Sequence, residues 1–346
     1  MRVLAIETSC DETSAAVVSR HEGNATVESL VILSQDIHKV FGGVVPELAS
    51  RAHLETIIPV TEQALAQSGI TISDIDGIAV TRGPGLLGAL LVGVTWAKTL
   101  AWREGIPLIG VHHMEGHLFA PTLEDSTLKP PFTALLVSGG HTMLLDVPTW
   151  GDYHLLGATL DDAAGEAFDK VGTLLGLEYP AGAAIERLAS TGDPRRFKFP
   201  RPLLKGAHER DRWNFSLSGL KTAVLRAVQQ SDDIDADRVH LARGFQDAVI
   251  EVLVAKTLDA AREFGRDTVV LGGGVACNRT LAQAMRDAAP AGTRVSVASP
   301  RLNSDNAAMI GAAGSWRLLR GERDDSTLAA ADSLPLPGLT TGDPIA

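Results

Sequence analysis

The same arrangement of two strands around a short polar turn occurs twice in this 346-residue chain. Residues 2–19, RVLAIETSCDETSAAVVS, have an apolar run, a turn rich in Ser, Thr and acidic residues, and a second apolar run. Residues 132–147, FTALLVSGGHTMLLDV, repeat this order, and helical and strand-like segments follow each copy. The repetition predicts an α/β protein with two related lobes, which we expect to face each other across a cleft.

We expect the first lobe over residues 1–125 and the second over residues 126–346. The polar stretch 122–131, which ends in two prolines, is the predicted linker. Helical patterns near 180–265 predict an insertion in the second lobe, and the last clear helix is expected to return toward the first lobe. The Pro-, Thr- and Asp-rich tail after Gly321 is expected to be loosely held.

Composition excludes several classes of protein. Hydrophobic residues make up 45% of the sequence and charged residues 21%, as in a globular protein. The stretch LLGALLVGVTWAKTLAW is interrupted by Gly, Thr and Lys, and the start MRVLAIETSC has no signal-peptide pattern, so we expect no membrane span and no membrane partner. The two cysteines, Cys10 and Cys277, are far apart, which favours a reducing compartment. We therefore expect a cytoplasmic protein.

The stretch VHHMEGH, residues 111–117, predicts a metal site. On a helix, His113 and His117 lie one above the other and could both bind one metal ion. Glu115 points to the opposite side, whereas zinc peptidases place their general base directly after the first histidine. Asp305, at the start of the last clear helix, is the candidate third ligand. Packed, hydrogen-bonded histidines and an aspartate that caps a helix remain alternative interpretations of these residues.

Three polar or glycine-rich turns could accept a nucleotide. VSGGHT, residues 137–142, lets backbone amides converge on an anion, and GGGVACN, residues 272–278, opens a helix whose free amides favour a phosphate. ETSCDETS, residues 7–14, supplies hydroxyl groups, but its three acidic residues would repel a phosphate unless a cation intervenes. Each turn alone is a weak signal, and together they favour a nucleotide site. None matches a Walker A or dinucleotide fingerprint, so those folds are excluded.

One basic stretch stands out against a formal net charge of −11. Residues 195–215, RRFKFPRPLLKGAHERDRWNF, carry seven Lys and Arg residues with aromatic residues and His208 between them. Charge for phosphates and flat rings for stacking predict a site for single-stranded or loop RNA. A solvated loop with a few aromatic anchors is the alternative.

These stretches resemble one family closely, the tRNA adenosine threonylcarbamoyltransferases of the actin and sugar-kinase superfamily, formerly labelled glycoprotease-like. The matching stretches are ETSCDETSAA, HHMEGH, LLVSGGHT, DDAAGEAFDK, YPAG, NFSLSGLKT, GGGVACNRT and SDNAAM, in the family's order and over nearly the whole chain. Two small apolar departures occur: Ala181 stands where the family often has glycine, and Leu217 where it often has phenylalanine. They affect the shape of a pocket and not the resemblance itself.

The resemblance implies two duplicated actin-like, RNase H-like lobes that face a nucleotide- and metal-binding cleft. His113, His117 and Asp305 would bind one divalent metal ion, with iron as the first choice and zinc as the second. Asp11 and Glu12 would take the proton of the reacting amine or orient the substrate. The remaining implied residues would bind substrate, and they are Val137, Ser138, Gly139, Gly140, His141, Asp169, Gly182, Glu186 and Asn278.

The implied reaction transfers the threonylcarbamoyl group of threonylcarbamoyl-adenylate to the exocyclic amine of adenosine 37, with release of AMP. The acceptor would be a tRNA that reads codons beginning with A, and the FxFPRP stretch and Lys221 would face this RNA. The implied protein partners are a paralogous actin-like protein and a small ATPase of the bacterial modification complex. Three alternatives are an actin-like small-molecule kinase, a metallopeptidase and a non-catalytic scaffold of a tRNA-modifying complex.

Overall fold

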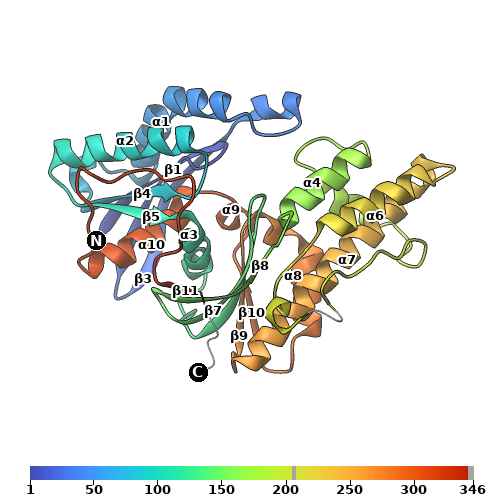
Figure 1. The fold of residues 1–346 in the computed structure, drawn as a ribbon. Helices are drawn as coiled ribbons and strands as arrows, with labels where there is room; N and C mark the ends of the chain where they lie inside the picture. Colours follow the sequence, from blue (N-terminus) through green and yellow to red (C-terminus); the bar gives the residue numbers. More distant parts are fainter. Residues whose placement is uncertain (205–207, 342–346) are drawn as a thin grey trace. The chain divides into compact units, whose positions relative to one another are not determined.

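The chain forms two compact units, which Figure 1 shows in one ribbon drawing. The computed structural model describes residues 1–204 and 208–341. The units are Met1–Leu128 with Ala298–Pro337, and Lys129–Val297 with the residues from Gly338 onward. Among the described residues, no helix combines the length and the apolar character that crossing a membrane requires.

The first unit is built on a five-stranded sheet in the order β3-β2-β1-β4-β5. The first three strands pair antiparallel, and β4 and β5 continue the sheet parallel to β1. Residues Val3 to Ile6 of β1 are fully buried, so packed elements cover both faces of the sheet. The strands are β1 (Arg2–Glu7), β2 (Glu12–His21), β3 (Asn24–Ser34), β4 (Gly77–Gly83) and β5 (Leu108–His112).

Helices cover this sheet on both sides. In Figure 1, α1 (Pro46–Ser68) and α2 (Leu87–Glu104) lie side by side on one face, and α10 (Ala307–Leu319) lies on the other. Small residues let α10 approach the strands closely, because a Cβ on Gly314 would be only 2.4 Å from the Cβ of Ala79. The shorter elements of this unit are η1 (Asp36–Phe41), η2 (Ile72–Asp74), α3 (His113–Phe119), η3 (Ala120–Leu123) and α9 (Pro300–Asn303).

The second unit repeats this plan in a sheet with the order β10-β9-β6-β7-β8-β11. Strands β6 to β8 pair antiparallel, and β9 and β10 continue parallel to β6. The order β8-β7-β6-β9-β10 therefore matches β3-β2-β1-β4-β5 of the first unit, and the predicted duplicated, actin-like α/β fold is confirmed. The strands are β6 (Phe132–Val137), β7 (Thr142–Thr149), β8 (Asp152–Ala158), β9 (Thr268–Gly272), β10 (Arg294–Val297) and β11 (Leu339–Thr341).

The helices of the second unit pack around α7, which has 30 residues and is the longest helix among the described parts of the chain. Its Phe245 packs edge to face against Phe168 of α4, with ring centroids 5.1 Å apart. The helices are α4 (Ala164–Leu174), α5 (Gly182–Ala189), α6 (Ser218–Gln229), α7 (Ile234–Glu263) and α8 (Arg279–Ala288), with the short η4 (Glu209–Asp211) and η5 (Gly274–Cys277).

Residues 322–341 are held by hydrogen bonds, which corrects the expectation of a loosely held tail for this part of the chain, while residues 342–346 lie outside the described residues. Lys98 Nζ donates to the carbonyl of Leu328 at 3.1 Å, and the Ala331 amide donates to the carbonyl of Arg82 at 2.8 Å. Strand β11 then pairs parallel with β8. The expectation was wrong because proline and threonine content does not report backbone hydrogen bonds to strands that are distant in sequence.

Candidate active site

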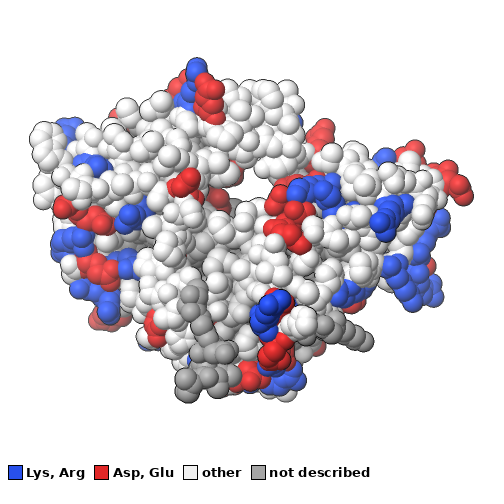
Figure 2. Space-filling view, in the orientation of Figure 1, with Lys and Arg blue, Asp and Glu red and all other residues white. Residues whose placement is uncertain are grey.

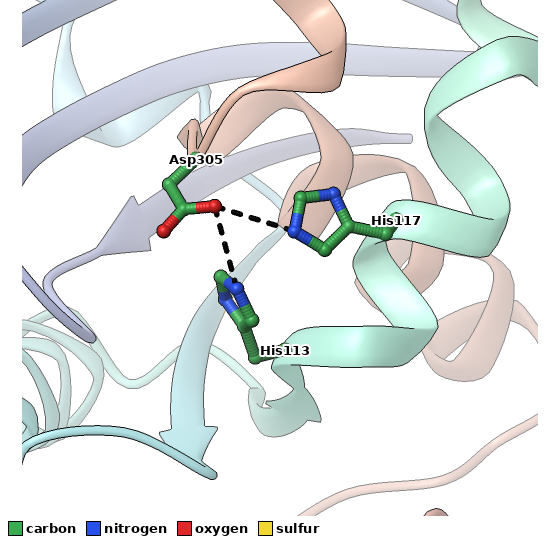
Figure 3. A group of neighbouring side chains, drawn as sticks. All are labelled: His113, His117 and Asp305. Carbon is green, nitrogen blue, oxygen red and sulfur yellow. Dashed lines mark ion pairs between the residues drawn. The ribbon is translucent and has the colours of Figure 1, made fainter. Parts of the chain in front are cut away.

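Three side chains from two segments converge in the first unit, as Figure 3 shows. His113 and His117 come from α3, Asp305 comes from the residues just before α10, and their ligand atoms all lie within 4.8 Å of one another. Asp305 Oδ1 is 3.4 Å from His113 Nε2 and 3.3 Å from His117 Nε2. Two ligand atoms that are each about 2.1 Å from one ion at a tetrahedral angle would be about 3.4 Å apart. The three residues could therefore hold one divalent metal ion.

The hydrogen bonding of the two histidines agrees with this fit. Both rings are buried, and among the described residues neither ring nitrogen of His117 has a hydrogen-bond partner. His113 Nδ1 lies 3.1 Å from Glu7 Oε2 and donates its proton to it, so a metal ion bound at Nε2 would replace the proton that this nitrogen otherwise shares with Asp305. Ring nitrogens without a partner are costly in a buried place, and a cation would satisfy one of the two nitrogens of His117.

Local sequence explains how these side chains are positioned. Strand β5 ends at His112, whose ring Nδ1 accepts the Met114 amide at 3.1 Å and so caps α3 at its first turn. The spacing of four residues then places His113 and His117 on one face of α3. Asn306 caps α10, so Asp305 does not have the role of a helix cap.

The charges of the site also favour a cation. Burial alone would raise the pKa of Asp305, but His113 and His117 hold it far below its usual range. Burial lowers the pKa of His113, but Asp305 and Glu7 together raise it well above its usual value. The site thus keeps two carboxylates ionised in a buried place, which a bound metal ion would neutralise in place of a proton.

Glu115 lies on the other side of α3, as the spacing predicted. It is fully buried and forms a two-bond ion pair with Arg317 of α10, whose Nε and Nη2 each donate to it at 2.7 Å. The carboxylate that a peptidase would need as its base is therefore occupied by a structural partner.

Glu7 contacts the candidate metal group, and the sequence did not identify it as part of that group. Its Oε2 accepts from Thr81 Oγ1 at 2.6 Å and from His113 Nδ1, and its Oε1 accepts from the Ser9 amide. Carboxylates on the far nitrogen of a metal-binding histidine fix its tautomer and orientation. The acidic turn was noticed as a sign of a cation, but a pairing across 106 residues leaves no local pattern.

We expect Glu7→Gln to lower the affinity of the protein for a divalent ion by about 10–100-fold. The neutral side chain of glutamine attracts the Nδ1 proton of His113 less strongly than the carboxylate of glutamate does. Equilibrium dialysis followed by metal analysis measures this change. Glu28→Gln is the control, since Glu28 pairs with Arg2 near the surface. Equal metal affinity in the Glu7→Gln and Glu28→Gln proteins would contradict the assigned role.

The acidic turn lies in the same unit. Asp11 and Glu12 stand where the β1–β2 turn enters β2, and both side chains are half-buried. Burial, the charge of Asp305 and the charge of Asp11 all raise the pKa of the Glu12 carboxyl. The turn therefore lies within the electrostatic reach of the metal group.

The glycine turn of the second unit joins β6 to β7. The Ser138 amide donates to the carbonyl of His141 at 2.8 Å, while Gly139 and Gly140 are exposed and have open space at their Cα atoms. Val137 ends β6 next to the end of β9, because β6 and β9 pair in parallel. Both glycine turns thus lie at the carboxyl edge of one sheet, where α/β proteins commonly bind ligands.

The other predicted substrate residues hold neighbouring segments of this edge together. Asp169 Oδ1 accepts the Ala181 amide at 2.8 Å, directly before α5 begins at Gly182. Burial is the main influence that raises the pKa of Asp169. Glu186 Oε1 accepts the Thr280 amide at 3.1 Å, which links α5 to α8.

Asn278 caps α8 by accepting the Leu281 amide at 2.9 Å, and its side-chain amide donates to Gln246 at 3.0 Å. Its side chain is therefore fixed at the mouth of the turn GGGVACN. The nine predicted substrate residues all lie in the second unit, whereas the metal group and the acidic turn lie in the first.

The aromatic residues of the stretch 195–215 are mostly anchors. Phe199 and Phe215 are buried, and Trp213 Nε1 donates to Asp259 Oδ2 at 3.1 Å. The prediction of a stacking platform is wrong for these rings, because the interleaved pattern arises from a loop that covers α7. Lys205 lies outside the described residues.

Most described arginines of this stretch form ion pairs and contribute less free charge than the sequence suggested. Examples are the pairs Arg195–Asp193, Arg196–Asp237, Arg201–Glu251 and Arg212–Asp259. Lys198 is exposed, as Arg195 and Arg196 are.

Comparisons with known proteins agree with this geometry. Two units with the same strand order define a protein of the actin-like fold, and the first unit adds a His-His-Asp group that could hold a metal ion. A family model described as TsaD: tRNA N6-adenosine threonylcarbamoyltransferase matches residues 26–312. The chain belongs to the tRNA N6-adenosine threonylcarbamoyltransferase family.

The relatives match over almost their whole length. A tRNA N6-adenosine threonylcarbamoyltransferase of Gemmatimonas aurantiaca is 57% identical, with 98% of each chain covered. One of Syntrophotalea carbinolica is 52% identical, with 97% of each chain covered.

Among solved structures, HypF of T. kodakarensis is similar in fold, with a TM-score of 0.62 at 14% identity over 92% of this chain and 48% of that one. Component A of the Acidaminococcus fermentans (R)-2-hydroxyglutaryl-CoA dehydratase has a TM-score of 0.54 at 12% identity, over 92% of this chain and 99% of that one. These two likenesses concern the fold alone.

Proposed function

We propose that this protein transfers the threonylcarbamoyl group of threonylcarbamoyl-adenylate to the exocyclic amine of adenosine 37 in tRNAs that read codons beginning with A. The observation that carries the proposal is the group of His113, His117 and Asp305, which has the geometry of a metal site in a chain that belongs to this family throughout its length. The protein would work in the cytoplasm, whose reducing conditions suit a chain whose two cysteines, Cys10 and Cys277, form no disulfide.

In this proposal the second unit binds the adenylate. The amides of Gly139 and Gly140 approach the phosphate, because a Cβ on either residue would meet nothing within 4 Å and a ligand can come close to this backbone. The positive end of the α8 helix dipole favours the same negative charge. The starts of α5 and α8 are held in place by the hydrogen bonds described above for Asp169, Glu186 and Asn278.

The first unit would hold the metal ion through His113, His117 and Asp305, with iron as the first candidate and zinc as the second. Such an ion supplies a Lewis acid that stabilises negative charge as it develops on oxygen. Glu7 fixes the proton of His113 on Nδ1 and so keeps Nε2 ready as a ligand.

The reaction forms a bond between the adenosine amine nitrogen and the carbamoyl carbon and breaks the bond from that carbon to the adenylate oxygen, so that AMP leaves. The amine then loses a proton, which Asp11 or Glu12 could accept. Because the amine lone pair is delocalised into the purine, placement of the two substrates matters more than a strong base.

The nucleosides of cellular tRNA test this function. We expect threonylcarbamoyladenosine to disappear from the tRNA of cells depleted of the protein and to return with the wild-type gene, as measured by mass spectrometry. Purified protein supplied with tRNA, threonylcarbamoyl-adenylate and its partners should release AMP. Phosphate transfer to a small molecule, or binding of all components without turnover, would instead favour the kinase or the scaffold.

Gly165→Ala is expected to disturb the adenylate turn specifically. A Cβ at this position would lie 2.7 Å from both Gly139 Cα and Ser138 O, so the turn must move. We expect the affinity for AMP, measured by calorimetry, to fall, together with about 1–3 kcal/mol of unfolding free energy. Gly219→Ala is the control, since nothing lies within 4 Å of its added Cβ. Equal AMP affinity in both variants would contradict the placement of the site.

An exposed apolar face on the first unit supports a protein partner. Leu54 and Ile58 of α1 and Leu87 and Leu91 of α2 are all exposed, each pair is one helical turn apart, and the two helices pack together. Trp102, further along α2, is 84% exposed. Figure 2 shows few charged side chains over these two helices in that view. Exposed apolar surface of this kind is typical of a docking site. We assign this site to the paralogous actin-like partner. The small ATPase would be a further member of the same complex.

Ile58→Asp should prevent this partner from binding, because a charge would lose its water at the centre of an apolar contact. Size-exclusion chromatography of the mixed proteins measures the loss. Glu62→Lys, at an exposed position one turn further along α1, is the matched control. Retained binding by Ile58→Asp would exclude this face as the docking site.

The tRNA would contact exposed cations of the second unit. Figure 2 shows Lys and Arg side chains over α6 and α7, and Lys198 is an exposed member of the stretch named above. These cations are suited to phosphates and not to base recognition.

A further inference from the structure

A buried polar network lies directly behind the turn that carries Asp11 and Glu12. His53 of α1 is fully buried, and its Nε2 lies 3.0 Å from the carbonyl oxygen of Cys10. A carbonyl can only accept, so Nε2 carries the proton and donates it. Nδ1 of the neutral ring then accepts from Thr13 Oγ1 at 2.8 Å. One imidazole thus holds the turn on both sides of the two acids.

Gln35 holds the same turn from the segment after β3. Its backbone amide donates to the carbonyl of Asp11 at 3.0 Å. Its side-chain Oε1 accepts from Nε2 of the buried His38 at 2.9 Å, and Nδ1 of His38 accepts the Val45 amide at 3.2 Å. With this orientation, the side-chain Nε2 of Gln35 donates to the carbonyl of Ala49 in α1 at 3.3 Å and packs against the ring of His53.

The network binds the turn through main-chain carbonyls and one hydroxyl, and not through the carboxylates of Asp11 and Glu12. Burial is the main influence that lowers the pKa of His53, which keeps the ring neutral with a single donated proton. Apolar side chains would fill this space at a lower cost in free energy than the polar network does, because each buried polar group must find a hydrogen-bond partner. A polar network retained at this place points to a requirement for a fixed turn.

We propose that His53, supported by Gln35 and His38, is a positioning residue for the transfer reaction. It acts through the turn Cys10–Thr13 and fixes where the carboxylates of Asp11 and Glu12 lie. The inference rests on the proposed function, and nothing in it requires His53 to touch the substrate.

His53→Leu removes both hydrogen bonds to the turn. We expect kcat for AMP release to fall by about 100-fold, as for a misplacement of about 1 Å. The KM for each substrate and the bound metal should stay unchanged, because the metal ligands and the adenylate turn are not altered. His53→Gln keeps an amide that can donate to Cys10, so it should recover part of the lost kcat. Thr61→Val is the matched control, since Thr61 is buried in the same helix and bonds to Ile57 and Trp96.

A double-variant comparison separates positioning from general destabilisation. If His53 acts through Glu12, adding His53→Leu to Glu12→Gln should lower kcat little further, and the same comparison with Asp11→Asn tests the other acid. Fully additive losses with both acids, or losses equal to those of Thr61→Val, would overturn the proposal. Full activity of both Asp11→Asn and Glu12→Gln would also overturn it.

Hydrogen exchange gives a readout that does not depend on activity. The amides of residues 10–13 and of Gln35 should exchange faster in His53→Leu than in wild type, while those of β1 stay protected. A wild-type protein with no transfer activity would contradict the proposed function, and the exchange experiment would still decide whether His53 fixes the turn. Unchanged exchange at these amides would overturn the inference.

Discussion

His113→Ala is expected to abolish threonylcarbamoyl transfer while the protein stays folded. Loss of an outer partner of a metal ligand typically costs 10–100-fold, so loss of the ligand itself should cost more than about 100-fold in kcat. The removed ring has its Nε2 3.4 Å from Asp305, and no other described histidine shares this group with His117. Three measurements test this result: the amount of modified nucleoside in tRNA from complemented cells, the amount of bound metal, and the circular dichroism spectrum of the protein.

His21→Ala is the control for this experiment, because His21 is exposed at the end of β2. It should retain metal, fold and transfer. A His113→Ala protein that transfers at full rate without bound metal would remove the catalytic role of the metal. If His113→Ala does not fold, Glu7→Gln tests the role of the metal instead, because it lowers the metal affinity and leaves the three ligands in place.

Arg317→Met is expected to lower the free energy of unfolding by about 3–5 kcal/mol, since it leaves a buried carboxylate without its partner. Glu115 is fully buried, and Arg317 donates two hydrogen bonds to it. Denaturant unfolding followed by circular dichroism measures the change, provided that the transition is two-state.

The double variant Glu115→Leu with Arg317→Met distinguishes a lost ion pair from lost packing. With both charges removed, no charge remains buried and unpaired, so most of the stability should return. The apolar pair should also keep the metal, because His113 and His117 face away from it. A loss below about 1 kcal/mol in Arg317→Met would show that water reaches Glu115.

The sequence predicted those features that depend on local pattern. The alternation of apolar runs and polar turns predicted both sheets, since strand pairing within a hairpin involves neighbouring segments. The spacing of His113 and His117 predicted a shared face of α3, and it correctly placed Glu115 on the opposite side.

Apart from Asp305, the candidate third ligand beside His113 and His117, features that join distant segments were not predicted. Glu115 and Arg317 are 202 residues apart, and Glu7 and His113 are 106 residues apart, so no spacing rule connects them. The aromatic residues of the stretch 195–215 show the opposite error. Their regular spacing suggested exposed rings, whereas packing in the hydrophobic core of the second unit buries Phe199 and Phe215. Whether an aromatic ring lies inside or outside depends on the partner that covers it.

The matching strand orders of the two units make the turn after β1 and the turn after β6 equivalent positions. In one copy this position carries Asp11 and Glu12, and in the other it carries Ser138, Gly139 and Gly140 without any acid. Duplication of an ancestral unit would allow such a division of labour, because one copy could gain negative charge for a cation while the other kept bare amides for an anion. With the proposed sites, neither turn could serve both ions at once, so the doubled architecture would resolve an electrostatic conflict that a single unit would have to bear.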